Sequence, residues 1–200
     1  MKPTNKPMKR LSLYLFLILF SLQIPSLADD IRDFELEGIS IGDSLLDYFS
    51  EEEIKESHVP GVYDDKYYLV SLLFKPSLVY DYITVTYKPK DNKYKIYGLT
   101  GLLDFPNNIE GCYKKQVEIV EVISKEFDKI KKVEWGILIF DEVDKSTYKP
   151  VTFVDKNGNG LSISCYHYPN KPENDNLKTA MDSEEFKKYI TFTAVEATND

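Results

Sequence analysis

The sequence predicts an α+β fold: an antiparallel sheet with one long amphipathic helix packed on a face. Two observations lead to this class. Residues 67–103 contain three short runs rich in aromatic and β-branched side chains, separated by Pro76-Ser77 and by a polar stretch that begins at Pro89. Short strands with such connectors indicate an antiparallel meander. Residues 111–131 repeat apolar side chains at three- and four-residue steps, which places them on one stripe of a helix.

Two short helices are expected ahead of the meander, within residues 39–57. Asp43 follows a glycine and can cap the first of them. Ser50, with Glu53 three positions later, has the spacing of a capping box at the start of the second. The meander strands themselves are expected at 67–74, 80–87 and 94–103.

The long helix is expected to bury its apolar stripe and to leave a face of mixed charge in water, which is typical of a core helix. After it, the segment 155–160 holds two Asn-Gly steps between alternating runs, a strong signal for a hairpin. Ser183 can cap a last helix, and the tail from Thr191 is expected to fray. These later elements are expected at 134–140, 151–154, 161–168 and 184–190. The helical stripe consists of Tyr113, Val117, Val120, Ile123, Phe127 and Ile130.

The order of elements repeats along the chain, because each part has a helix followed by strands. We therefore expect residues 29–200 to form one α+β domain, with two similar halves at 37–105 and 108–192. No sequence period matches the two parts, so their similarity is one of element order alone.

The first 28 residues have the layout of a cleavable secretory signal peptide. Four basic residues precede an apolar run over 11–24, and small residues stand at the −3 and −1 positions of a cut after Ala28. A bilayer-spanning helix needs about 20 apolar residues, and this run is shorter. We expect the chain to be exported and cleaved after Ala28, to be a periplasmic or secreted protein, and to have no membrane insertion once the signal is removed.

The charge of the remaining chain argues against a nucleic-acid partner. The leader carries four of the 25 basic residues and none of the 33 acidic ones, so the formal net charge of residues 29–200 is −12. Binding to phosphates needs clustered Lys and Arg side chains. We therefore expect no nucleic acid, and an unknown protein or small-molecule ligand as the partner.

Both cysteines, Cys112 and Cys165, lie after the leader. An even number of cysteines in an exported protein favours a disulfide. The alternative is a pair of buried free thiols, because spacing along the chain does not show whether the two residues meet.

Two resemblances accompany these patterns. The stretches IRDFELEGISIGDSLLDYFSEEEI, YDYITVTYKPKDNKYKIYGLTGLLDF and GCYKKQVEIV look like a family of exported, uncharacterised proteins from marine alphaproteobacteria. This resemblance spans nearly all of the chain after the leader and implies an exported location. Residues 39–60 followed by three strands are similar to the helix-helix-three-strand modules of outer-membrane assembly lipoproteins and β-lactamase inhibitor proteins. The shared helix start is Ile39-Ser40-Ile41-Gly42-Asp43-Ser44, and the chain lacks the lipid-bearing cysteine of the lipoproteins.

Asp155, Asn157 and Asn159, followed by Gly160, match the first half of a calcium loop. The twelfth position of that loop would be Tyr166, where the loop requires a bidentate glutamate. A hairpin turn explains the same residues. We expect calcium to bind weakly or not at all, and we expect no other metal and no cofactor.

Catalytic signatures are sparse. His58 and His167 are the only histidines, and the sequence contains no HExxH, GxSxG or glycine-rich phosphate loop. A zinc site needs three or four ligands. We expect no catalytic residue. The alternative is an envelope hydrolase whose site is assembled from scattered acids and His167.

Tyrosine is the conspicuous excess, with 15 in the chain. In the strand expected at 80–87, Tyr80 and Tyr82 share one face with Thr84 and Thr86. If the opposite face packs on the helices, Tyr80, Tyr82 and Tyr97 form an outward binding surface of amphipathic rings. The alternative is that tyrosine simply suits strands. We conclude that the sequence predicts a non-enzymatic periplasmic or secreted binding module.

Overall fold

The computed structural model describes residues 30–60, 62–63, 66–72, 79–127 and 129–197, and the expected signal peptide lies outside these ranges. Within them the chain is α+β, as predicted, with nine strands in one antiparallel sheet. The strands are β1 (His58–Val59), β2 (Tyr68–Leu72), β3 (Tyr82–Tyr87), β4 (Ile96–Asp104), β5 (Lys131–Glu134), β6 (Leu138–Asp141), β7 (Ser146–Val154), β8 (Gly160–His167) and β9 (Asn176–Asp182). The helices are α2 (Glu51–Glu56), α3 (Ile109–Glu126) and α4 (Glu184–Ala197), with 3-10 turns at η1 (Ile31–Asp33), η2 (Leu45–Asp47) and η3 (Pro172–Asn174).

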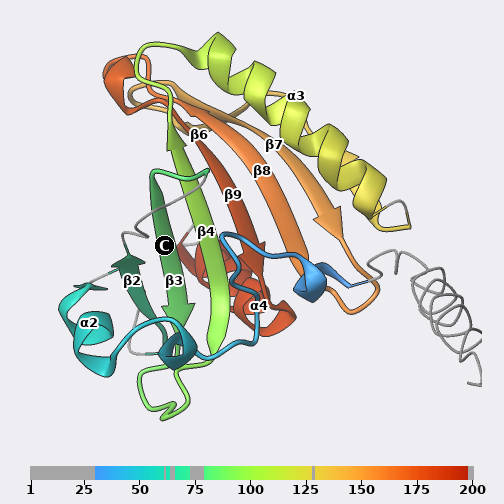
Figure 1. Ribbon diagram of the computed structural model, residues 1–200. Helices are drawn as coiled ribbons and strands as arrows, with labels where there is room; N and C mark the ends of the chain where they lie inside the picture. The colour runs from blue at the N-terminus through green and yellow to red at the C-terminus, as the bar shows by residue number, and fades with distance from the viewer. Residues whose placement is uncertain (1–29, 61, 64–65, 73–78, 128, 198–200) are drawn as a thin grey trace, which may run out of the picture.

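The sheet has the order β1-β2-β3-β4-β9-β8-β7-β5, and β6 pairs with β7 beside β5. Strand β9 is therefore central, with β4 on one side and β8 on the other. Figure 1 shows the long strands fanning across the molecule, with α3 lying over β7 and β8 and the N-terminal segment crossing the strands. The Asn-Gly turn joins β7 to β8 as predicted.

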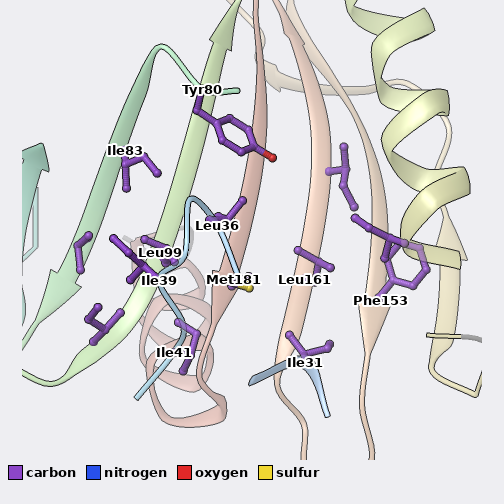
Figure 2. Packing of buried hydrophobic residues seen from close by; sticks show 14 of the residues in the cluster. Ile31, Leu36, Ile39, Ile41, Tyr80, Ile83, Leu99, Phe153, Leu161 and Met181 are labelled. Carbon is purple, nitrogen blue, oxygen red and sulfur yellow. The ribbon is translucent and has the colours of Figure 1, made fainter. Parts of the chain in front are cut away.

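The main core fills the space between the sheet and the elements on one of its faces. The N-terminal segment contributes Ile31, Leu36, Ile39 and Ile41, which face side chains of β3, β4, β8 and β9 in Figure 2. Helix α3 closes the rest of this face and contacts β8 and β9. We call it the covered face; its fully buried side chains include Phe127, Phe153, Leu99, Leu161 and Met181.

Two contacts fix α3 to the strands beneath it. A disulfide joins Cys112 of α3 to Cys165 of β8, with their Cα atoms 6.0 Å apart. One turn further on, the buried Gln116 donates its amide hydrogens to the carbonyl oxygens of Lys149, at 2.6 Å, and Ile163, at 2.8 Å. The helix is thus anchored by one covalent bond and one buried polar side chain.

Helix α4 packs on the opposite face of the sheet, against β4 and β9. Its Phe186 is buried over Gly98, where an added Cβ would come within 2.9 Å of the ring. A glycine in the strand therefore makes room for the aromatic ring of the helix. We call this side the open face, because α4 covers only its lower end (Figure 1).

Several local predictions were confirmed and others were wrong. The capping box of Ser50 and Glu53 is present. The first short helix is only the turn η2, and its cap is Ser44; Asp43 instead accepts hydrogen bonds from the Ser40 amide and the Tyr48 hydroxyl. Helix α4 continues to Ala197 in place of fraying at Thr191.

The stripe of α3 and the strand pattern also needed correction. Val117 was expected in the core but is exposed, because Cys112 and Gln116 take the buried positions one residue earlier. The single strand expected at 134–140 is two strands, β5 and β6, separated by a break around Gly136. Strand β9 was not predicted at all, although it lies at the centre of the sheet.

Candidate functional site: a groove on the open face

The open face of the sheet is hollowed into a cavity of about 440 Å³. Its floor is made of short side chains from four neighbouring strands, β3, β4, β9 and β8. Its lower end is closed by Phe186 and Ile190 of α4 and by Tyr63. We call this cavity the groove. The small floor residues are Thr84, Thr100, Ser162, Ser164 and Ala180.

Strand register explains why these residues line one row. Thr84 pairs with Thr100, Thr100 with Ala180, and Ala180 with Ser162. Paired residues in an antiparallel sheet point to the same face, so the row forms a strip of hydroxyl and methyl groups across the sheet. A floor of this kind offers several hydrogen-bonding groups to a ligand without filling the space above.

Lys178 is the cation of the groove. It lies on β9, paired with Ser164 on one side and Leu102 on the other. Its ammonium group stands 4.3 Å from the centre of the Tyr166 ring, a cation–π contact. Burial lowers the pKa of the Lys178 ammonium. No carboxylate within the described ranges forms an ion pair with it.

Asp182 lies four residues further along the same strand and faces the same way. Its strand partners are Gly98 and Gly160, which carry no side chain beside it. Burial raises the pKa of the Asp182 carboxyl to about 6, and the nearby Lys187 ammonium offsets only part of that rise. Among the described residues the groove thus holds a cation without an ion-pair partner and a buried acid with a raised pKa, and their Cα atoms are about 13 Å apart along β9.

The raised pKa of Asp182 predicts a pH-dependent gain in stability from Asp182→Asn. The unfolded carboxyl titrates near 3.8 and the folded one near 6, so the wild type loses stability as the pH rises between these values. We expect the variant to be more stable by about 3 kcal/mol at pH 8 and unchanged at pH 3. Urea unfolding at both pH values measures this. The exposed control Asp47→Asn should change stability by less than about 0.5 kcal/mol, and an equal gain at pH 3 would contradict the assignment.

The upper end of the groove is aromatic. Tyr166 stacks on Tyr148 with ring centres 5.6 Å apart, and Phe140 meets both rings edge-on. Tyr168 also meets the Phe140 ring edge-on, with ring centres 5.7 Å apart. Burial raises the pKa of the Tyr166 hydroxyl to about 12, and the Tyr166 side chain lines the groove.

The three tyrosines predicted to form a binding face are not brought together. The prediction for Tyr80 was wrong: it precedes β3, is only 8% exposed, and folds over Gly101 on the covered face (Figure 2). Tyr82 does face outward and hydrogen-bonds Asp104 at 3.0 Å. Tyr97 is half-buried at the other end of β4, against Tyr67 and under the ammonium of Lys88. The alternation of side chains along residues 80–87 predicted that Tyr80 faces outward with Tyr82. This was wrong because Gly101 of β4 has no side chain and leaves space for the Tyr80 ring.

The two histidines lie far apart, on β1 and β8. His58 packs against the Tyr68 ring. His167 directs Nδ1 to the buried carboxylate of Asp175, at 3.0 Å, and Asp175 also accepts a hydrogen bond from the Tyr168 amide. Within the described residues, Asp175 is the only hydrogen-bonding partner of the His167 side chain, and no cluster of three metal-ligating acid, cysteine or histidine side chains occurs.

The carboxylate of Asp155 serves the hairpin turn itself. One oxygen accepts the amides of Asn157 and Asn159, and the other accepts the Ile31 amide and the Asn159 side chain. Asp155 therefore joins the N-terminal segment to the β7–β8 turn. Its oxygens are engaged in hydrogen bonds that a calcium ion would have to displace.

Sequence reasoning missed Lys178 and Asp182, because they lie on the strand that it did not predict. In the segment 176–182 the buried residues Leu177, Thr179 and Met181 alternate with the less buried Lys178, Ala180 and Asp182. That period of two was the available signal. Its low content of β-branched and aromatic residues concealed it.

Comparison with known proteins adds no relative: no family model matches the chain, and no curated protein matches it. Among the described residues, no helix is both long and apolar enough to cross a bilayer.

Proposed function

We propose that this protein is an exported, non-enzymatic binding module, periplasmic or secreted, that receives a ligand with an acidic group in the groove. The observation that carries the proposal is the half-buried ammonium of Lys178 on the groove floor, whose contact within the described chain is the face of Tyr166. An ammonium that has lost part of its hydration favours an anionic partner. Export is supported by the leader-like residues 1–28 and by the disulfide.

The rest of the groove suits a small polar molecule. Hydroxyl groups of Thr100, Ser162 and Ser164 surround the position of Lys178, and Tyr166 offers an aromatic edge and a hydroxyl. Ligand sites commonly combine apolar walls with a few polar groups that set orientation. A sugar acid or another small hydroxylated carboxylate matches both the cation and the hydroxyl floor.

The test is titration of the isotopically labelled protein with D-glucuronate, using uncharged methyl glucoside as the matched probe. We expect glucuronate alone to shift amide resonances of residues 100, 162–166 and 178–182. Lys178→Met should weaken glucuronate binding roughly tenfold to a hundredfold, because a charge-assisted hydrogen bond is lost.

A matched control exists on the covered face. Lys149 also places its ammonium over a tyrosine ring, 5.0 Å from the centre of Tyr113, so Lys149→Met removes a similar cation–π pair away from the groove. That variant should bind as the wild type does. Equal binding of glucuronate by Lys178→Met and wild type would contradict the proposal.

A second candidate function, an envelope hydrolase, is favoured by the pairing of His167 with Asp175. A buried carboxylate that holds Nδ1 leaves Nε2 available as a base. Hydrolysis of p-nitrophenyl acetate that is abolished by His167→Gln and retained by Lys178→Met would support this candidate. Within the described residues no serine or cysteine hydrogen-bonds the His167 side chain, and the same His167–Asp175 pair is also explained by its anchoring of the turn before β9.

A further inference from the structure

The lower end of the groove holds a carboxyl group that has no partner in the described part of the chain. Asp182 lines the groove, and its strand neighbours Gly98 and Gly160 have no side chain to offer it. Side chains of α4 lie over both glycines, and the one over Gly160 is Lys187. The Lys187 ammonium donates to a backbone carbonyl oxygen of the β7–β8 turn, 3.3 Å away. Among the described residues, the Asp182 carboxyl therefore forms neither a hydrogen bond nor an ion pair.

The two charged side chains of the groove face the same way on β9 but do not meet. Their Cα atoms are about 13 Å apart, because four residues of a strand separate them. The Lys178 ammonium contacts the ring of Tyr166. Tyr166 pairs with Asn176, on the side of Lys178 that is away from Asp182. The ammonium therefore points away from the carboxyl, and each charge is left for a separate group of a ligand.

The floor between these charges is polar and neutral. Lys178 and Asp182 are the only charged side chains among the described residues that line the groove. The hydroxyl groups of Ser162 and Ser164 hydrogen-bond each other at 2.9 Å, which uses one of their two hydrogens and leaves the other for a ligand. Thr100 adds a further hydroxyl to the floor. Hydroxyl groups both donate and accept, so this floor suits amide groups in the middle of a ligand.

We propose that the ligand is a linear zwitterion about as long as a tripeptide, whose carboxylate binds Lys178 and whose ammonium binds Asp182. This inference rests on the proposed function, because it takes Lys178 as the site of the acidic group. Three extended residues span about 10 Å, and a charge-assisted hydrogen bond of about 2.8 Å at each end extends the reach to about 16 Å. That reach covers the distance along β9 and the outward direction of the ammonium. A single amino acid, about 3.5 Å long, cannot reach both charges.

The test is calorimetric titration at pH 7 with triglycine and two analogues of the same shape, in a buffer that contains no amine or carboxylate. N-acetylglycylglycine has a hydrogen in place of the ammonium, and triglycine amide has an amide in place of the carboxylate. At this pH the Asp182 carboxyl, with a pKa of about 6, is ionised, and the amino group of triglycine is mostly protonated. We expect each analogue to bind the wild type about tenfold to a hundredfold more weakly than triglycine, because each lacks one charge-assisted hydrogen bond.

Two variants assign the ends of the probe to their partners. In Asp182→Asn the difference between triglycine and N-acetylglycylglycine should fall below about threefold, because the ammonium has lost its anionic partner. In Lys178→Met the difference between triglycine and its amide should disappear in the same way. The exposed control Asp47→Asn should keep all three affinities. Asp182→Asn is expected to be more stable than the wild type at this pH, so its weaker binding cannot come from unfolding.

D-glucuronate separates this inference from the proposed function. It carries no ammonium, so Asp182→Asn should bind it at least as tightly as the wild type does, whereas Lys178→Met should bind it more weakly. Wild type that binds glucuronate through Lys178 but binds triglycine and N-acetylglycylglycine equally, or does not bind triglycine at millimolar concentration, would overturn the zwitterion and leave the proposed function standing. Binding of both glucuronate and triglycine that is unchanged in Lys178→Met would overturn both.

Discussion

Replacing both Cys112 and Cys165 by alanine is expected to lower the free energy of unfolding by about 4 kcal/mol, from the chain-entropy estimate for a closed loop of this length. The two residues are 53 positions apart, so the bond excludes many extended conformations of the unfolded chain. It also joins α3 to β8, two elements that the folded state must bring together across the β5–β7 segment. Domains of this size are stable by about 5–15 kcal/mol, so the loss would be a large part of the total.

Urea unfolding of the oxidised wild type and the double-alanine variant measures this effect. Wild type unfolded in the presence of dithiothreitol is the internal control, and its midpoint should fall close to that of the variant. A variant whose midpoint equals that of the oxidised protein would show that the bond contributes nothing to stability.

Gln116→Glu is expected to destabilise the protein by about 3–5 kcal/mol at pH 8, because it places a carboxylate in the interior beside two carbonyl oxygens. The wild-type side chain donates hydrogen bonds to the carbonyl oxygens of Lys149 and Ile163. A carboxylate has no hydrogen to donate, so it would face two acceptors. Burial and these oxygens would raise the pKa of the introduced carboxyl above its unfolded value.

The pH dependence distinguishes the charge from the lost hydrogen bonds. For an acid with a raised folded pKa, the penalty is absent below the unfolded pKa and grows as the pH rises toward the folded one. The loss should therefore shrink at pH 4. The neutral control Gln116→Met should lose about 1–3 kcal/mol at both pH values, since only the hydrogen bonds are removed. Equal losses for Gln116→Glu at pH 4 and pH 8 would contradict this explanation.

Local signals in the sequence predicted the elements that depend on near neighbours. Ser50 and Glu53 cap α2 because both partners lie within one helical turn. The Asn-Gly steps turn β7 into β8 because the geometry of a tight turn is set by its own residues. The cysteines bond as an even pair.

The direction in which a side chain points, toward the core or toward solvent, was harder to predict, because it depends on the residues of neighbouring strands. The alternation of Tyr80 with Tyr82 predicted a shared face, but the vacancy above Gly101 on the neighbouring strand draws the Tyr80 ring into the core. In α3 the buried positions begin at Cys112 and Gln116, because the disulfide and two strand carbonyls fix how the helix is rotated. Val117 is exposed as a result.

The sequence by itself determined the α+β class, the long amphipathic helix, the capped and turning segments and the even cysteine pair. Each of these rests on residues close together in the chain or on composition. Only the tertiary structure decided that residues 176–182 form the central strand, because their partners in β4 and β8 are brought there by the fold. The tertiary structure also decided that Lys178 and Asp182 share a groove. The desolvation of a charged side chain depends on which strands surround it. The order of those strands is set by packing over the whole sheet.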